Sequence, residues 1–149
     1  MDYKRIIKRI NEKPRRNNYV SPNTEVRPSS IHGIGLFATS ELQKGTVVAV
    51  WGGHAMTSKE LESLPRRISS NYAIEVYPGF WLAEKSTTEL DSGDFVNHSC
   101  TPNCTILDKL VMIAKKKILG GEELTADFSY KGGGVIKCGC GSRRCKRLF

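Results

Sequence analysis

The sequence lacks any long hydrophobic run. No apolar segment of the 149-residue chain approaches the roughly 20 residues that a helix needs to cross a bilayer. The first 13 residues mix charges with isoleucines and do not form the apolar centre of a signal peptide. Internal repeats of about 20–50 residues are also absent. We therefore expect no membrane span, and an intracellular, reducing compartment rather than secretion.

Acidic residues are scarce at both ends of the chain. Residues 1–20 carry seven Lys or Arg against two acids, and residues 131–149 carry six Lys or Arg and no acid. The chain has a net charge of +8, so its central part is mildly acidic. Basic ends can make weak contacts with a nucleic-acid backbone or can simply form a solvated face. An acidic centre suits a cationic substrate better than a nucleic-acid groove.

Five cysteines leave one unpaired in any scheme of disulfides, and in a reducing compartment clustered cysteines favour a metal. Cys138, Cys140 and Cys145 form the pattern C-x-C-x4-C. Structural zinc takes four ligands, often all sulfur, so these thiols leave a tetrahedral site one ligand short. Cys100 is the obvious fourth ligand. The competing interpretation is that the thiols are free and packed in the core.

Short β-rich segments separated by Gly, Pro and Asn turns follow one amphipathic stretch. Isoleucines at helical spacing predict a helix near residues 3–10 that Pro14 ends. The run from Thr57 to Glu60 is a capping box and predicts a second helix that Pro65 closes. Strands are predicted at 36–38, 46–51, 72–77, 80–82, 105–107, 110–114 and 123–128, with hairpin turns at Pro78-Gly79 and Asp108-Lys109. We expect a mainly β (α+β) fold with a basic N-terminal extension over residues 1–20, one domain over residues 21–130 and a tail over residues 131–149.

Four segments carry the chemistry. They read HGIGLFA at 32–38, NHSCTPNC at 97–104, GEELTADFSY at 121–130 and CGCGSRRC at 138–145. Together and in this order they resemble the SET-domain protein lysine methyltransferases with a post-SET zinc tail, in a compact form without a pre-SET cysteine cluster. The likeness runs from about Pro22 to Leu148. It implies a SET fold of short β-sheets with knot-like threading near its C-terminus and a small zinc-bound tail.

The resemblance assigns roles to residues. The backbone of His32, Gly33 and Ile34 would hold S-adenosyl-L-methionine, with Asn97, His98, Tyr72 and Leu148 as further contacts. One structural zinc ion would be bound by Cys100, Cys138, Cys140 and Cys145, whereas Cys104 has no ligand role and packs in the core. Aromatic walls suit an entering lysine cation. The candidates for the lysine channel are Trp81, Phe95, Ala126, Phe128, Tyr130 and Phe149, and core packing is the other interpretation of each aromatic ring.

Phe128 stands where the family usually has a catalytic tyrosine. Loss of a hydrogen bond made in the transition state costs about 2–4 kcal/mol. Tyr130, two residues further along a strand, would point to the same face, and Tyr72 is the other tyrosine that could supply the hydroxyl. Ala126 is small where the family often has Phe or Tyr, which predicts room for more than one methylation.

The main prediction is methyl transfer from S-adenosyl-L-methionine to a lysine amine of a protein substrate, either a histone or another basic protein. One alternative is a SET-fold binding module with weak or no turnover because of Phe128. A second makes Cys100 and His98 a thiol nucleophile and its base, and a third makes the basic ends a nucleic-acid-binding surface. The sequence carries no signal of oligomeric state.

Overall fold

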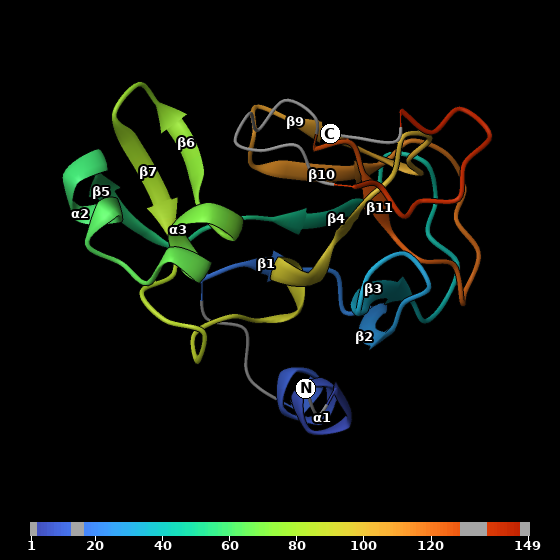
Figure 1. Cartoon of the computed structure of the whole chain (residues 1–149). Coiled ribbons are helices and arrows are strands. Elements are labelled where there is room, and N and C mark those ends of the chain that lie inside the picture. Colours follow the sequence, from blue (N-terminus) through green and yellow to red (C-terminus); the bar gives the residue numbers. More distant parts are fainter. Residues whose placement is uncertain (1–2, 13–16, 129–136, 147–149) are drawn as a thin grey trace.

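The computed structural model describes residues 3–12, 17–128 and 137–146. The chain opens with helix α1 (Tyr3–Glu12), which confirms the predicted N-terminal helix. Its charged side chains face solvent, whereas Ile10 is only 2% exposed and belongs to the main core. The Asn11 side chain exchanges hydrogen bonds with the Val26 backbone, with N···O distances of 3.0 and 2.9 Å. The helix is therefore docked on the following strands (Figure 1).

Short strands dominate the described residues, which confirms the mainly β prediction. The largest sheet has the antiparallel order β1-β4-β10-β9, with β1 at Tyr19–Val20, β4 at Val47–Val50, β9 at Cys104–Leu107 and β10 at Val111–Ala114. Strands β2 (Thr24–Pro28) and β3 (Ile34–Ala38) form a separate antiparallel pair. A third sheet, β5-β7-β6, combines β5 (His54–Thr57), β6 (Ile74–Tyr77) and β7 (Phe80–Ala83).

The last pairing joins β8 (Asn97–His98) in parallel to β11 (Thr125–Ala126). The β9–β10 hairpin lies between these two strands in the sequence, so the pairing brings two of the motif segments side by side. This contact belongs to the region where the resemblance predicts knot-like threading. Strand β11 is shorter than the predicted strand 123–128, and Glu123 forms only an isolated bridge with Phe37.

The predicted turns are confirmed, and one proline plays a different part. Gly79 has φ 79°, and Asp108 and Lys109 have φ 46° and 65°, as tight hairpin turns require. Helix α2 (Ser58–Glu62) starts on the predicted capping box. Pro65 lies beyond its end but also serves as the N-cap of α3 (Arg66–Asn71), because proline is well tolerated where a helix begins. Strand β6 consequently begins at Ile74, not at Tyr72.

Two hydrophobic clusters form the core. The main cluster lies among the large sheet, the β2–β3 pair and α1, with Leu36, Val48, Met112 and Leu124 fully buried. A smaller cluster of Met56, Leu61, Ile68, Ala83 and Leu90 lies under the β5-β7-β6 sheet and its two short helices. Phe95, at the end of the 3-10 helix η1 (Ser92–Phe95), packs against both clusters. None of the helices in the described ranges is long and apolar enough to span a membrane.

Candidate functional site

The Asn97 side chain connects three of the motif segments. Its amide nitrogen lies 3.1 Å from the Ile34 carbonyl, 3.3 Å from the His32 carbonyl and 2.7 Å from Glu123 Oε1. An amide NH₂ group carries two hydrogens, so these acceptors share them. The structure thus brings Asn97 together with the loop at residues 32–34, where the resemblance places the cofactor.

Glu123 and Ser29 complete this network, and neither residue was selected from the sequence. The Ser29 hydroxyl donates to the Glu123 carboxylate at 2.8 Å and accepts from the Ile31 N–H at 2.9 Å. A Cβ on Gly35 would lie 2.1 Å from Glu123 Oε1, so the second glycine of the motif makes room for the carboxylate. The G-x-G pattern could have indicated this close approach of the backbone to a carboxylate, because glycine has no side chain in the way.

His98 is held between two parts of the chain. Its Nδ1 accepts a hydrogen bond from the Phe128 N–H at 3.1 Å, and its Nε2 lies 3.3 Å from Cys100 Sγ. Burial lowers the pKa of His98, which favours the neutral ring. With Nδ1 as an acceptor, a neutral ring carries its proton on Nε2 and donates it to the sulfur. His98 in this tautomer cannot remove a proton from the Cys100 thiol, which argues against the nucleophile–base pair.

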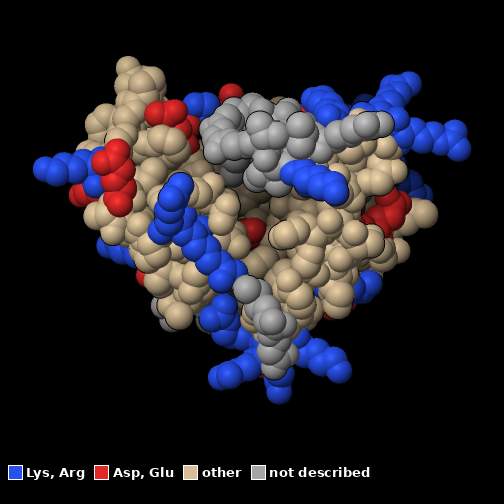
Figure 2. All heavy atoms as spheres, viewed as in Figure 1, with Lys and Arg blue, Asp and Glu red and all other residues tan. Residues whose placement is uncertain are grey.

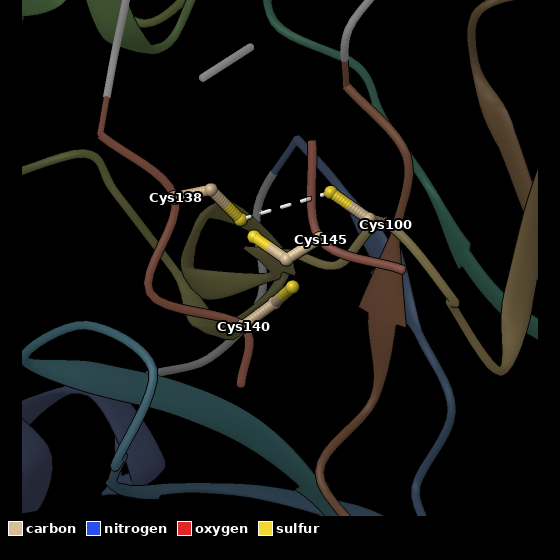
Figure 3. Close-up of side chains that lie close together, drawn as sticks. All are labelled: Cys100, Cys138, Cys140 and Cys145. Carbon is tan, nitrogen blue, oxygen red and sulfur yellow. Dashed lines mark hydrogen bonds between the residues drawn. The ribbon is translucent and has the colours of Figure 1, made fainter. Parts of the chain in front are cut away.

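The four predicted zinc ligands lie together. The sulfur atoms of Cys100, Cys138, Cys140 and Cys145 are all within 4.8 Å of one another, and they point towards a common centre (Figure 3). The Cys100 and Cys138 sulfurs are 3.8 Å apart. Zn–S bonds of about 2.3 Å in a tetrahedron require sulfur atoms about 3.8 Å apart. The donor set and its spacing therefore fit a tetrahedral zinc ion.

The tail also touches the other motif segments. A Cβ on Gly139 would lie 2.5 Å from the Ile31 carbonyl, so the tail backbone runs directly over the loop before His32. The Lys146 N–H donates to Cys100 Sγ at 3.3 Å, and its ammonium lies 3.4 Å from Asp127 Oδ2. A metal held by the four sulfurs would fix these contacts.

Tyr72 and two of the aromatic channel candidates gather around the smaller core cluster. The Tyr72 and Phe95 rings meet edge to face with centroids 6.4 Å apart, and Trp81 packs against the same cluster. The Trp81 indole N–H donates to Ser58 Oγ at 3.0 Å, which fixes the ring on the α2 side. Burial raises the pKa of the Tyr72 hydroxyl, so this hydroxyl stays protonated at neutral pH.

Phe128 packs against an aromatic residue that the sequence did not single out. The Trp51 and Phe128 rings lie 6.1 Å apart, and the Trp51 indole N–H donates to the Gly93 carbonyl at 2.8 Å. Ala126 is fully buried in the main core beside His98. Cys104 is likewise fully buried and outside the sulfur cluster, and burial raises the pKa of its thiol to about 12.

Three predicted site residues, Tyr130, Leu148 and Phe149, lie outside the described residues. A cavity of about 340 Å³ lies between α1 and β2, and none of the predicted site residues lines it. The face that carries the sheets has a hollow beside the β5-β7-β6 lobe, with acidic atoms at its floor (Figure 2). Basic side chains project from this face at its lower margin and at the upper right (Figure 2).

Comparison with protein-family models matches residues 33–129 to the SET domain. Histone-lysine N-methyltransferase trithorax of Drosophila virilis is 31% identical over 133 residues, which cover 81% of this chain and 3% of that protein. Histone-lysine N-methyltransferase 2B of Homo sapiens is 30% identical over 135 residues, covering 81% and 5%. Histone-lysine N-methyltransferase, H3 lysine-4 specific, of Schizosaccharomyces pombe is 28% identical over 132 residues, covering 80% and 14%. The chain therefore spans only a small part of the length of these relatives.

Proposed function

The chain belongs to the SET-domain family, and on that premise we propose that it transfers a methyl group from S-adenosyl-L-methionine to the side-chain amine of a lysine in a protein substrate. The similar proteins are named histone-lysine methyltransferases, which supports a histone or another basic protein as the substrate. The observation that carries the proposal is the Asn97 side chain. It joins the loop at 32–34 to Glu123, next to the sulfur cluster.

The residues at the loop fit the amino-acid end of the cofactor. Asn97 Nδ2 is engaged within the protein, whereas Oδ1 accepts no hydrogen bond from the described residues. This oxygen is available to accept from an ammonium group. Gly33 has φ 49°, which turns its peptide in a way that few other residues adopt. S-adenosyl-L-methionine would supply an activated methyl group on a sulfonium; Asn97 and the backbone of His32, Gly33 and Ile34 would orient it.

We assign the zinc ion a structural role. Four thiolates close the coordination sphere, and a closed site has no open position for catalysis. The ion would hold the tail over the Ile31 carbonyl and beside Asp127, at the side of the site where Leu148 and Phe149 are predicted to close it. His98, which donates from Nε2 to Cys100, would be the outer-shell partner that orients one ligand.

The protein must also present a neutral amine in line with the methyl group. A free lysine has a pKa near ~10.4, so it enters as a cation and must lose a proton. Aromatic faces attract the cation, and an apolar channel favours the neutral amine. Tyr72, Phe95 and Trp81 on one side, and Phe128 with Trp51 on the other, are the proposed walls. Most of the reduction in the barrier to methyl transfer comes from holding the lysine nitrogen and the methyl carbon in line at about 3–3.5 Å.

The presence or absence of a catalytic hydroxyl decides between two functions, an active methyltransferase and a binding module. Phe128 supplies none, and its backbone N–H is committed to His98. Strand β11 ends at Ala126, so strand alternation does not fix the direction of Tyr130. We propose Tyr72 as the hydroxyl among the described residues and retain Tyr130 as the other candidate. The second function, favoured by Phe128, is a binding module that holds cofactor or peptide with weak or no turnover.

A methyl-transfer assay tests these proposals. The full chain is incubated with labelled S-adenosyl-L-methionine and core histones or a basic non-histone protein, and products are read by mass spectrometry. We expect methylated lysine, a large loss in Asn97→Ala, and an unchanged rate in Glu62→Gln, an exposed control on α2. Tyr72→Phe and Tyr130→Phe locate the hydroxyl, and Phe128→Tyr tests whether the ring position can accept one. No transfer while S-adenosylhomocysteine still binds would establish the binding module.

Two finer proposals concern products and partners. The small Ala126 side chain supports room for more than one methyl group, and only monomethyl-lysine at long reaction times would refute this. The exposed basic residues of α1 support weak nucleic-acid contact, which steeply salt-dependent DNA binding would reveal. A histone-like substrate also supports an intracellular location.

A further inference from the structure

A second group of potential metal ligands lies away from the sulfur cluster. Strands β5 and β7 run side by side (Figure 1). His54 begins β5 and is paired with Ala83 of β7, so Glu84 follows immediately beside it. Glu89 returns to the same place after the turn at residues 85–88, and its carboxylate accepts from the Lys85 N–H at 2.8 Å. One ligand atom from each of His54, Glu84 and Glu89 lies within 4.8 Å of the other two.

The Glu84 carboxylate provides a second observation, besides the short distances, that indicates a bound ion. Glu84 is only 2% exposed. Its Oε2 accepts from Asn17 Nδ2 at 2.7 Å, but its buried Oε1 has no hydrogen-bond partner among the described residues. A buried acceptor without a partner is costly, and such atoms usually have an ion, water or donor beside them. A cation among the three side chains would provide that partner.

The charge of the group also calls for a cation. Two carboxylates face one imidazole, and among the described residues they form one ion pair, from His54 Nε2 to Glu89 Oε2 at 3.3 Å. Arg9 reaches the same loop, but its guanidinium contacts the Thr87 carbonyl. A divalent ion would bring two carboxylates and a neutral imidazole to zero net charge.

We propose that His54, Glu84 and Glu89 form a second metal site that takes a divalent transition-metal ion such as Zn²⁺. Zinc bonds of about 2.0–2.2 Å to nitrogen and oxygen place neighbouring ligand atoms about 3.4 Å apart in a tetrahedron, close to the His54–Glu89 distance of 3.3 Å. The Asn17 amide, held on the other Glu84 oxygen, orients that ligand from outside the coordination sphere. The remaining position is left for water.

Metal binding at this site would also support the segment that leads to Asn97, at the proposed cofactor site. Its ligands join the start of β5, the end of β7 and the loop that leads through η1 to Asn97. Gly53, just before His54, has φ 130°, and a Cβ there would lie 3.0 Å from the Ala83 backbone nitrogen. The two strands therefore approach closely where the ion would sit. Metal binding would fasten the β5-β7-β6 sheet to the segment that carries the main site.

Counting zinc tests the proposal without any activity measurement. The full chain is dialysed at neutral pH against a buffered excess of free Zn²⁺, and zinc per chain is measured by elemental analysis. We expect two ions in the wild type and in the control Glu62→Gln. We expect loss of one ion in His54→Gln, Glu84→Gln and Glu89→Gln. Glu89→Gln alters a partly exposed loop residue, so it keeps the test valid if Glu84→Gln does not fold.

The Cys145→Ser variant separates the two sites. In this variant, added Zn²⁺ should still raise the Tm, and the additional Glu89→Gln substitution should remove that rise and weaken zinc binding about tenfold or more. A single zinc ion in the wild type would overturn the proposal and leave a proton shared between Glu84 and Glu89 as the account of the pair. Two ions retained in both Glu84→Gln and Glu89→Gln would also overturn it, because the second ion would then lie elsewhere.

Discussion

The sulfur cluster and the His54–Glu84–Glu89 group differ in how the chain assembles them. Three of the four thiols come from eight consecutive residues of the tail, and Cys100 reaches them from the turn after β8. The second group draws its ligands from the start of β5, the end of β7 and a loop. The three tail cysteines are brought together by local spacing, whereas His54 and Glu84 meet because β5 and β7 pair in one register.

The two groups also suit different metal chemistry. Thiolates are soft ligands and select zinc, and four of them leave no open position. Imidazole and carboxylate are harder ligands, and three of them leave room for water. We propose that one site fastens the tail over the loop at residues 32–34, whereas the other braces the sheet that carries Trp81 of the proposed lysine channel.

The largest expected effect is the loss of the sulfur site. Cys145→Ser, or removal of zinc by a chelator, should reduce methyl transfer to background, because the tail would no longer be held against Ile31 and Asp127. The β core should stay folded, since no described residue of the tail belongs to either hydrophobic cluster. Tritium transfer and far-UV circular dichroism measure the two effects.

The control for this prediction is Cys104→Ser. Cys104 is buried outside the cluster, so its substitution should lower stability without lowering the zinc content. An unchanged transfer rate after verified zinc removal would contradict the role of the tail. Loss of the far-UV signal would instead show that the sulfur site supports the whole domain, and the contrast between the two groups would disappear.

A smaller effect is expected at the hydrogen-bond network of Asn97. Asn97→Ala removes the donor to Glu123 and the oxygen proposed to hold the cofactor. Hydrogen bonds to charged groups contribute about 1.5–3 kcal/mol, so we expect roughly 10- to 150-fold weaker binding of S-adenosylhomocysteine. Calorimetric titration measures this change. Glu123→Gln keeps the shape and an acceptor oxygen, so it should weaken binding less; equal affinity in all three proteins would exclude Asn97 from the cofactor site.

Much of the local structure could be predicted from the sequence because its causes are local. The capping box at Thr57, the turn at Pro78-Gly79 and the helix of spaced isoleucines all depend on residues within one or two turns of chain. Strand 123–128 was predicted too long, because pairing with β8 reaches only two of its residues. Helix α3 was missed, since a proline that ends one helix can equally begin the next.

The site shows the same division. The C-x-C-x4-C spacing was sufficient to predict the cluster of tail sulfurs, and Cys100, predicted as the fourth member, lies with them. Ser29, Trp51 and Glu123 were missed because each acquires its role from a contact with a residue far away in the sequence. The ligand role proposed for Glu84 depends likewise on the register of β5 and β7. Residues with such roles form no spacing pattern in a single sequence that would distinguish them from ordinary residues.

The next prediction concerns the pH dependence of stability near the His54–Glu84–Glu89 group, where the charge of Glu84 acts on Asp94. Burial, together with the negative charges of Asp91 and Glu84, raises the pKa of Asp94 to about 7, whereas an unfolded aspartate has a pKa of about 3.9. Between these values the unfolded chain loses its proton first, so this contribution to stability falls as pH rises from about 4 to about 7 and is lost above the folded pKa. Urea midpoints at pH values across this range should decrease in the wild type and less in Asp94→Asn.

Added zinc should change this pH dependence of stability. An ion among His54, Glu84 and Glu89 would offset the Glu84 charge that acts on Asp94, so added zinc should reduce the decrease in stability with pH. The same addition should have little effect through the sulfur cluster if that site is already filled. An identical pH profile in wild type and Asp94→Asn would show that another group dominates the titration.

The smallest expected effect concerns the far end of β5. Thr57 ends the strand that His54 begins, and its hydroxyl accepts from the Glu60 N–H while its own N–H donates to the Glu60 carboxylate. Loss of an N-cap costs about 1 kcal/mol, so Thr57→Ala should lower the urea midpoint slightly, and Thr57→Ser should restore it. Because the cap acts within one turn of α2, the zinc count should not change. A lost zinc ion in Thr57→Ala would mean that β5 shifts as a unit, and the second metal group would then depend on the whole strand rather than on its pairing at His54.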